Sequence, residues 1–112
     1  MATSATTAVA LNGNQNTFDV TGHDADLLFS TVAIGTQNRG ADLANVFSFD
    51  QGLLQMDSLT ASAKGANGFT TTTTINIGGG TVQTGAWTLS SSTGAGSAVT
   101  VANLTGGDIT FS

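Results

Sequence analysis

The chain has 112 residues, a formal net charge of −5 and a charged fraction of only 8%. Its length is that of one domain, and because Arg39 and Lys64 are its only Arg and Lys residues, we expect neither nucleic-acid binding nor attachment to an anionic membrane surface through charge. The absence of Cys excludes disulfides, a thiolate nucleophile and a Cys-based zinc site.

The composition favours β-strands over most of the chain. All seven acidic residues are Asp, and 20 residues are Thr. Glu, Lys and Arg, which favour helices, are absent or rare, whereas the β-branched Thr favours strands. Large apolar side chains are few, which indicates a thin core or a core completed by a neighbouring subunit. A surface with so few charges also suits close packing against other subunits.

The N-terminal segment differs from the rest of the chain. Residues 1–16 are small and polar apart from one apolar patch, Val9 to Leu11. We predict an extended N-terminal arm over 1–16, followed by a single β domain over 17–112. The segment lacks the basic and apolar regions of a secretion signal, and no stretch of the chain has the 18 apolar residues of a membrane-spanning helix. We therefore expect synthesis in the cytoplasm and no membrane partner.

Short strands are predicted between residues 17 and 63. Residues 18–20 alternate, and 27–34 have the β-branched and aromatic character of a buried strand. The segment 41–63 is compatible with a short helix capped by Asp42. It is also compatible with two strands, 46–49 and 53–56, joined by a turn at 50–52, and we favour the strands.

The C-terminal half has the most regular pattern. Residues 69–77 (FTTTTTINI) have the strongest strand propensity, and the strands after them are separated by Gly- and Ser-rich loops. This spacing is typical of an all-β sandwich or barrel, so we predict a small antiparallel β-sandwich or barrel, jelly-roll-like in character. No fixed-period repeat is apparent, which disfavours a solenoid.

His23, Asp24 and Asp26 form the densest group of functional side chains. They resemble half of a divalent-metal loop, but the following ligands and the terminal Glu are missing. The alternative is a polar turn in which the Asp side chains accept hydrogen bonds from the backbone. We favour the turn and predict no metal ligands.

Catalytic patterns are missing elsewhere as well. His23 is the only His, and no G-x-S-x-G pattern occurs. The remaining Asp residues flank turn signals. The glycines at 78–80 are not followed by the Lys and the helix that a phosphate loop needs. We therefore predict that the chain is not an enzyme and has no catalytic or cofactor-binding residues and no cofactor.

Two features allow a binding role. Trp87, the only Trp, is suited to stacking on a sugar or anchoring an interface, and equally to filling the core. The Thr-rich run over 69–77 is suited to an ice-binding array if Thr residues form ranks across several strands. Alternatively, it is an aggregation-prone edge that a partner would have to cover.

The chain resembles capsid decoration (cement) proteins of tailed phages. The resemblance lies in its length, its own initiator Met, its lack of Cys, its few charges and its richness in Thr, Ala and Gly. It implies a homotrimer, located on the virion surface, that stabilises a shell by binding the major capsid protein. It also implies that 1–16 clamps a neighbour by adding a strand to its sheet edge. The interface candidates are Val9, Leu11, Phe18 and Trp87, and the core or trimer candidates also include Phe29, Phe47 and Phe49.

Two alternatives stay open. One is a filament, fibre or tail subunit, which belongs to the same structural class. The other is a carbohydrate- or ice-binding β module.

Overall fold

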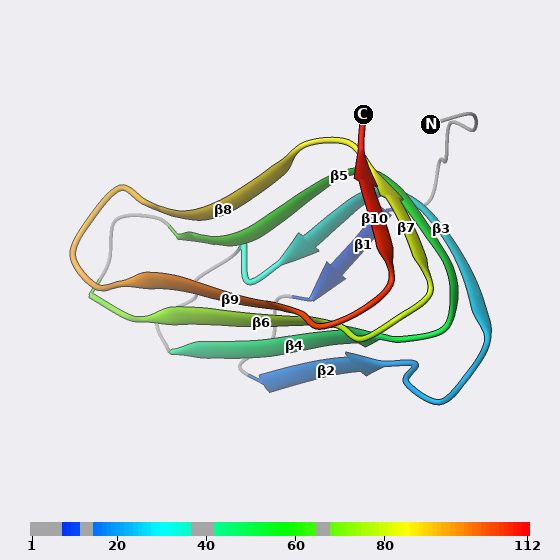
Figure 1. Ribbon diagram of the computed structural model, residues 1–112. Helices are drawn as coiled ribbons and strands as arrows, with labels where there is room; N and C mark the ends of the chain where they lie inside the picture. Colours follow the sequence, from blue (N-terminus) through cyan, green and yellow to red (C-terminus); the bar gives the residue numbers. More distant parts are fainter. Residues whose placement is uncertain (1–7, 12–14, 37–41, 65–67) are drawn as a thin grey trace.

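The computed structural model describes residues 8–11, 15–36, 42–64 and 68–112, which form ten strands in two sheets (Figure 1). The described residues contain no helix long and apolar enough to cross a membrane. The smaller sheet consists of β2 (Gln15–Asp19), β4 (Leu43–Phe49), β6 (Thr71–Ile77) and β9 (Ala98–Leu104). The larger sheet consists of β1 (Ala8–Leu11), β3 (Ala25–Ile34), β5 (Gly52–Lys64), β7 (Thr81–Thr84), β8 (Trp87–Ser92) and β10 (Asp108–Phe111).

The chain winds as a β-solenoid, because every strand pairing is parallel. Each coil passes through the smaller sheet and then through the larger one, which bends, so that the coil has three sides (Figure 1). We call the smaller sheet side one. Side two holds 25–29, 52–56, 81–84 and 108–111, and side three holds 8–11, 31–34, 58–64 and 87–92. Coil 1 covers 15–36, coil 2 covers 42–64, coil 3 covers 71–92 and coil 4 covers 98–112.

The prediction of an antiparallel sandwich or barrel was wrong, although the all-β class is confirmed. The predicted strands at 46–49 and 53–56 are present, but they lie in different sheets rather than in a hairpin. The physical reason is that Gly, Asn and Asp mark a bend of the backbone without specifying its angle. Here the bends turn corners between sides, whereas a hairpin turn would reverse the strand.

A repeat is present that the sequence pattern did not reveal. Partners in successive coils are 27 to 29 positions apart, as in Ala25 with Gly52, Leu53 with Thr81, and Gln15 with Ala44. The repeat is hidden because a single inward column contains different residue types. One such column on side one runs Phe18, Phe47, Ile75 and Ala102.

The core is a stack of inward columns. Because alternate residues of a strand point to opposite faces, each strand contributes every second side chain to the interior, as in β6, where burial alternates along the strand. The buried apolar cluster is Phe29, Val32, Ile34, Phe47, Phe49, Leu54, Met56, Leu59, Ala61, Ile75, Ile77 and Val82. Phe29, Phe47 and Phe49, which were candidates for core or trimer contacts, are therefore core residues.

Positive φ angles recur at two corners of the coils. Gly52, Gly80 and Gly107 have φ of 96°, 78° and 85° between sides one and two, in a conformation that favours glycine. At the end of side three, Ser62 and Ser90 have φ of 54° and 61°. They lie next to each other, since Ala61 pairs with Leu89 and Ala63 with Ser91. The first corner thus uses Gly in coils 2 to 4, and the second uses Ser in coils 2 and 3.

The N-terminal segment contributes two strands. β1 pairs in parallel with β3 of its own chain, and β2 begins at Gln15. The remainder of the expected arm, residues 1–7 and 12–14, lies outside the described residues, as do the side chains of Val9 and Leu11. Part of the predicted arm is therefore packed on its own solenoid.

Candidate functional site

The acidic turn that resembled half of a metal loop is an exposed corner. His23, Asp24 and Asp26 are exposed around the turn between β2 and β3. The described residues include no group of three His, Cys, Asp or Glu side chains placed to hold a metal ion. The polar turn without metal ligands that we favoured from the sequence stays a prediction.

Other Asp side chains connect neighbouring coils. Asp50 Oδ1 accepts a hydrogen bond from the Gly22 N–H at 2.9 Å, and Asp42 Oδ1 accepts one from the Thr70 N–H at 2.8 Å. Each contact spans 28 positions, which is one coil. These carboxylates satisfy corner N–H groups that the sheets leave unpaired, a structural role that needs no proton transfer.

Asp19 makes a local turn instead. Its Oδ1 accepts hydrogen bonds from the Thr21 hydroxyl at 2.6 Å and the Thr21 N–H at 2.9 Å. These two bonds, the hydroxyl first, lower the pKa of the exposed Asp19 carboxyl below its ordinary value. The group therefore stays ionised at neutral pH, which suits a turn and does not suit a general acid.

The Thr-rich run does not form a flat Thr face. Thr71 and Thr73 point inward and are buried, where the Ser62 hydroxyl lies 2.9 Å from the Thr73 hydroxyl and donates to the Val99 carbonyl at 2.7 Å. The outward Thr72 and Thr74 have Ala44, Val46, Val99 and Val101 as their register neighbours. Ranks of Thr across the strands are missing on this side, and β6 lies between β4 and β9 rather than at an edge.

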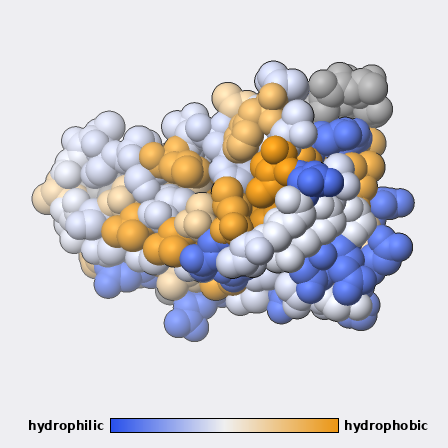
Figure 2. Space-filling model, viewed as in Figure 1, coloured by the Kyte–Doolittle hydropathy of each residue, from blue (hydrophilic) through white to orange (hydrophobic). Residues whose placement is uncertain are grey.

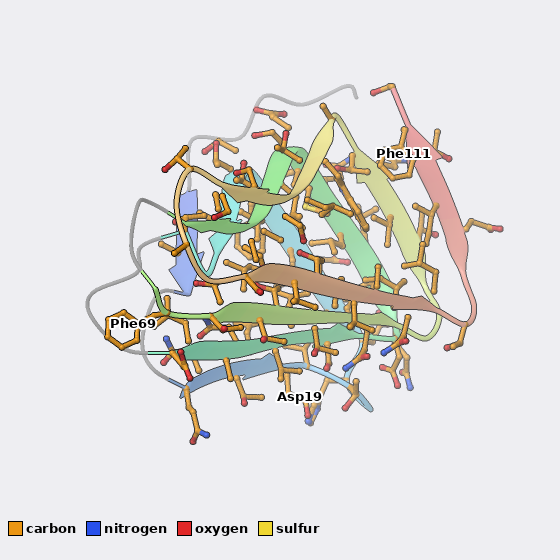
Figure 3. All side chains as sticks on the ribbon, turned by 90° about the vertical axis from the view of Figure 1, so that its left-hand side faces the viewer. Asp19, Phe69 and Phe111 are labelled. Carbon is orange, nitrogen blue, oxygen red and sulfur yellow. The ribbon has the colours of Figure 1, made fainter. Side chains whose placement is uncertain are left out.

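The two aromatic interface candidates lie at opposite ends of the solenoid. Phe18, on β2 in coil 1, stacks on Phe47 with ring centroids 5.1 Å apart. Trp87, on β8 in coil 3, donates from Nε1 to the Thr84 hydroxyl at 2.8 Å and meets Phe111 edge to face at 5.2 Å. Figure 3 shows Phe111 on β10 and Asp19 on β2, at opposite ends of the stack of coils.

The C-terminal end of the solenoid exposes inward columns. Leu104 is 48% exposed although Phe49 and Ile77 in its column are buried, and Phe111 is 54% exposed. Leu89 is 41% exposed above the buried Ala61. Figure 2 shows apolar residues gathered on the face that carries β8, β9 and β10. These side chains occupy core positions that no further coil of the described residues covers.

Both ends also present strand edges. β9 and β10 close their sheets on the C-terminal side, and β8 pairs only with β5. At the other end, β2 forms the edge of side one, and the 25–29 part of β3 forms the edge of side two. Such edges are templates for pairing with another chain, and natural proteins normally protect them with charges, bulges or covering segments. Asp108 is the only charged residue in β8, β9 and β10.

The coil repeat was the functional feature that sequence reasoning missed. Its signal was the placement of Gly52, Gly80 and Gly107 at nearly equal intervals before apolar residues, which a search for a repeat near 28 residues would have found. Without the repeat, the sequence could not show which residues lie at the two ends of the solenoid. Phe18 and Trp87 could therefore not be assigned to opposite ends. No family model, curated protein or solved structure matches the chain.

Proposed function

We propose that this chain is a structural subunit that assembles with copies of itself end to end, as a filament or fibre does. The observation that carries the proposal is the pair of ends of the described solenoid. One end has exposed apolar core positions and the terminal strands β9 and β10, and the other has β2 and the 25–29 part of β3, in the same two sheets and with the same strand direction. Solenoid proteins that act as monomers need terminal repeats with a polar outer face. Here the C-terminal face is apolar over Leu89, Leu104 and Phe111.

Continuing the columns gives the geometry of the contact. β2 of a second copy would lie beside β9, with Phe18 next to Ala102 in the column that already joins Phe47 and Ile75. The 25–29 part of β3 would lie beside β10, with Phe29 next to Phe111. Both contacts bury apolar surface and satisfy backbone groups, which are the two main sources of stability inside the solenoid.

The solenoid favours this proposal over a capsid decoration trimer. A trimer needs a rotational symmetry in which the third copy contacts the first. Copies stacked along a solenoid axis are related by translation along that axis, which gives a filament without a fixed number of subunits. We therefore place the filament, fibre or tail subunit first. The lack of an enzymatic role stays a prediction.

The carbohydrate- or ice-binding module has less geometric support. Trp87 is half-buried, its Nε1 is engaged by Thr84, and the Phe111 ring lies against it, so it is not an open platform for a sugar. The Thr residues of β6 alternate between the interior and the surface, so they do not form the regular outer array that ice binding needs.

Disulfide trapping tests the end-to-end contact. Thr17 and Val101 are exposed members of one outward column that runs through Val46 and Thr74. Within one chain they are three strand spacings apart, about 14 Å, which is too far for a disulfide. In the proposed stack, Thr17 of one copy is next to Val101 of another. The Thr17→Cys/Val101→Cys variant should therefore give a ladder of covalent oligomers on oxidation, without interference from native Cys.

The matched control is Thr17→Cys/Thr74→Cys. Thr74 has strand neighbours on both sides within its own chain, so this variant should stay monomeric under the same oxidation. Electron microscopy of concentrated wild-type protein should show filaments with an axial rise of about 19 Å per subunit, which is four strand spacings. An uncrosslinked Thr17→Cys/Val101→Cys variant, together with a monodisperse monomer at high concentration, would refute the proposal.

A further inference from the structure

The strands of the described residues do not divide into whole coils. Coil 4 has a strand on side one (β9) and a strand on side two (β10), but the described residues place no strand on side three of that coil. β1 is the opposite case: it lies on side three beside β3, one level before coil 1, and the described residues place no strand at that level on the other two sides. Among the described strands, coil 4 therefore lacks a strand on side three, and β1 is an additional strand on that same side at the other end of the solenoid.

We infer that β1 of each subunit completes coil 4 of the next subunit, lying between β3 of its own chain and β8 of its neighbour. This inference rests on the proposed end-to-end assembly and names the segment that locks it. The occupant of the open side three is thus a second copy of this chain, through residues 8–11.

The register of β1 fits this place. Val9 pairs with Val32, which is in the column of Leu59 and Trp87. Leu11 pairs with Ile34, which is in the column of Ala61 and Leu89. Continuing each column by one strand puts position 9 of the second copy beside Trp87 and position 11 beside Leu89. Two of the interface candidates from the sequence, Val9 and Trp87, thereby become register neighbours.

The chain positions also match along the coil. The Ser112 N–H donates to the Thr84 carbonyl at 3.0 Å, so Ser112 continues β10 at the place that Gly85 occupies in coil 3. Ala8 pairs with Thr31 and hence belongs to the column of Ser58, one position further along the coil. The register therefore puts residues 8–11 of one copy at positions along coil 4 that follow those of β10 in the neighbour, with no overlap between the two strands.

The chemistry of the two edges is compatible. β1 has the sequence AVAL, and β8 carries no charged residue, so pairing them buries no charge. Leu89 is 41% exposed and Phe111 is 54% exposed, and both border the open side. Adding a strand to an exposed sheet edge is a recurrent mode of protein recognition, in which the backbone supplies hydrogen bonds and the alternate side chains supply specificity.

The closing experiment uses a second Cys pair. Ala10 and Thr88 are exposed members of one column that runs through Ala33 and Thr60. Within one chain they are three strand spacings apart, about 14 Å, whereas in the inferred joint they are adjacent strand partners. Oxidised Ala10→Cys/Thr88→Cys protein should form covalent oligomers as readily as Thr17→Cys/Val101→Cys does. The control Ala10→Cys/Thr60→Cys should remain monomeric, since Thr60 has neighbours on both sides in its own chain.

The combined results separate the two proposals. Oligomers from both Cys pairs support the inference. Oligomers from Thr17→Cys/Val101→Cys alone keep the end-to-end assembly and overturn the role of β1. If neither pair forms oligomers, both proposals are overturned. Oligomers from the Ala10→Cys/Thr60→Cys control at a similar yield would mean random collision and would also overturn the inference.

Discussion

At the scale of single residues, the coil corners impose the strictest requirements on the sequence. Gly52 has a φ of 96°, and a Cβ built on it would lie 2.1 Å from the Ala25 carbonyl oxygen of the preceding coil. Gly80 and Gly107 repeat the conformation one and two coils later. A side chain at this corner is therefore unfavourable for two reasons: the positive φ strains any residue with a Cβ, and the Cβ would clash with the preceding coil.

Replacing the corner glycine of coil 2 should be costly. We expect Gly52→Ala to lower the free energy of unfolding by more than about 2 kcal/mol, because the backbone must leave its positive φ or move away from Ala25. The matched control is Gly68→Ala, where an added Cβ meets no atom within 4 Å and φ is not positive. Urea unfolding followed by circular dichroism measures both changes. Equal stability of the two variants would contradict the account of the corner.

At the scale of elements, β1 differs from the other strands. Among the described strands, it is the one that lies a level before coil 1, beside β3 on side three. The described core residues run from Phe18 to Ile109, through coils 1 to 4. Its place at the end of the stack of coils suits the assembly role inferred for it.

Deleting residues 1–11 tests this division of roles. We expect the truncated chain to keep its β circular dichroism and a cooperative melt, because coils 1 to 4 stay whole, although Val32 and Ile34 lose their neighbours in β1. Its end-to-end association should weaken at least tenfold, or about 1.4 kcal/mol, because coil 4 of the neighbour is no longer completed. Sedimentation velocity over a concentration series measures the association. Undiminished association of a folded truncated chain would count against the function assigned to β1.

At the scale of the whole molecule, stacking has one unfavourable feature. Asp26, Leu53, Thr81 and Asp108 form one outward column. In the stack, Asp26 of a second copy therefore lies beside Asp108, about one strand spacing away. Like charges placed directly opposite on neighbouring strands are destabilising. The repulsion is exposed and hence weakened by salt, since the screening length falls to about 8 Å at physiological ionic strength.

Reversing one of these charges should strengthen assembly. We expect Asp108→Lys to tighten end-to-end association by roughly two- to fivefold at low salt, because it replaces a repulsive pair with an attractive one. The control Asp57→Lys makes the same charge change at an exposed position of coil 2, away from both ends. Sedimentation equilibrium at two salt concentrations compares them. An equal effect of the two variants would mean that net charge, rather than the Asp26–Asp108 register, controls association.

The sequence by itself determined the local features of this protein. The Thr-rich composition and the alternation over 71–77 specify strands, because a β-branched side chain fits a pleated surface and alternate residues face opposite ways. Gly and Asp specify where those strands end. The same reasoning predicted a strand over 46–49 and a turn that begins at Asp50, and both are confirmed.

Only the tertiary structure decided how these strands are joined and where the chain is open. Alternation is the same in parallel and antiparallel sheets, and a glycine bend leaves the angle of the turn free, so local patterns could not distinguish a solenoid from a sandwich. The positions of Phe18 and Trp87 at opposite ends follow from the register between coils, which is a property of residues 27 to 29 positions apart. The surface proposed for assembly could not be predicted from the sequence for that reason, because it combines residues of different strands that come together only when the coils stack.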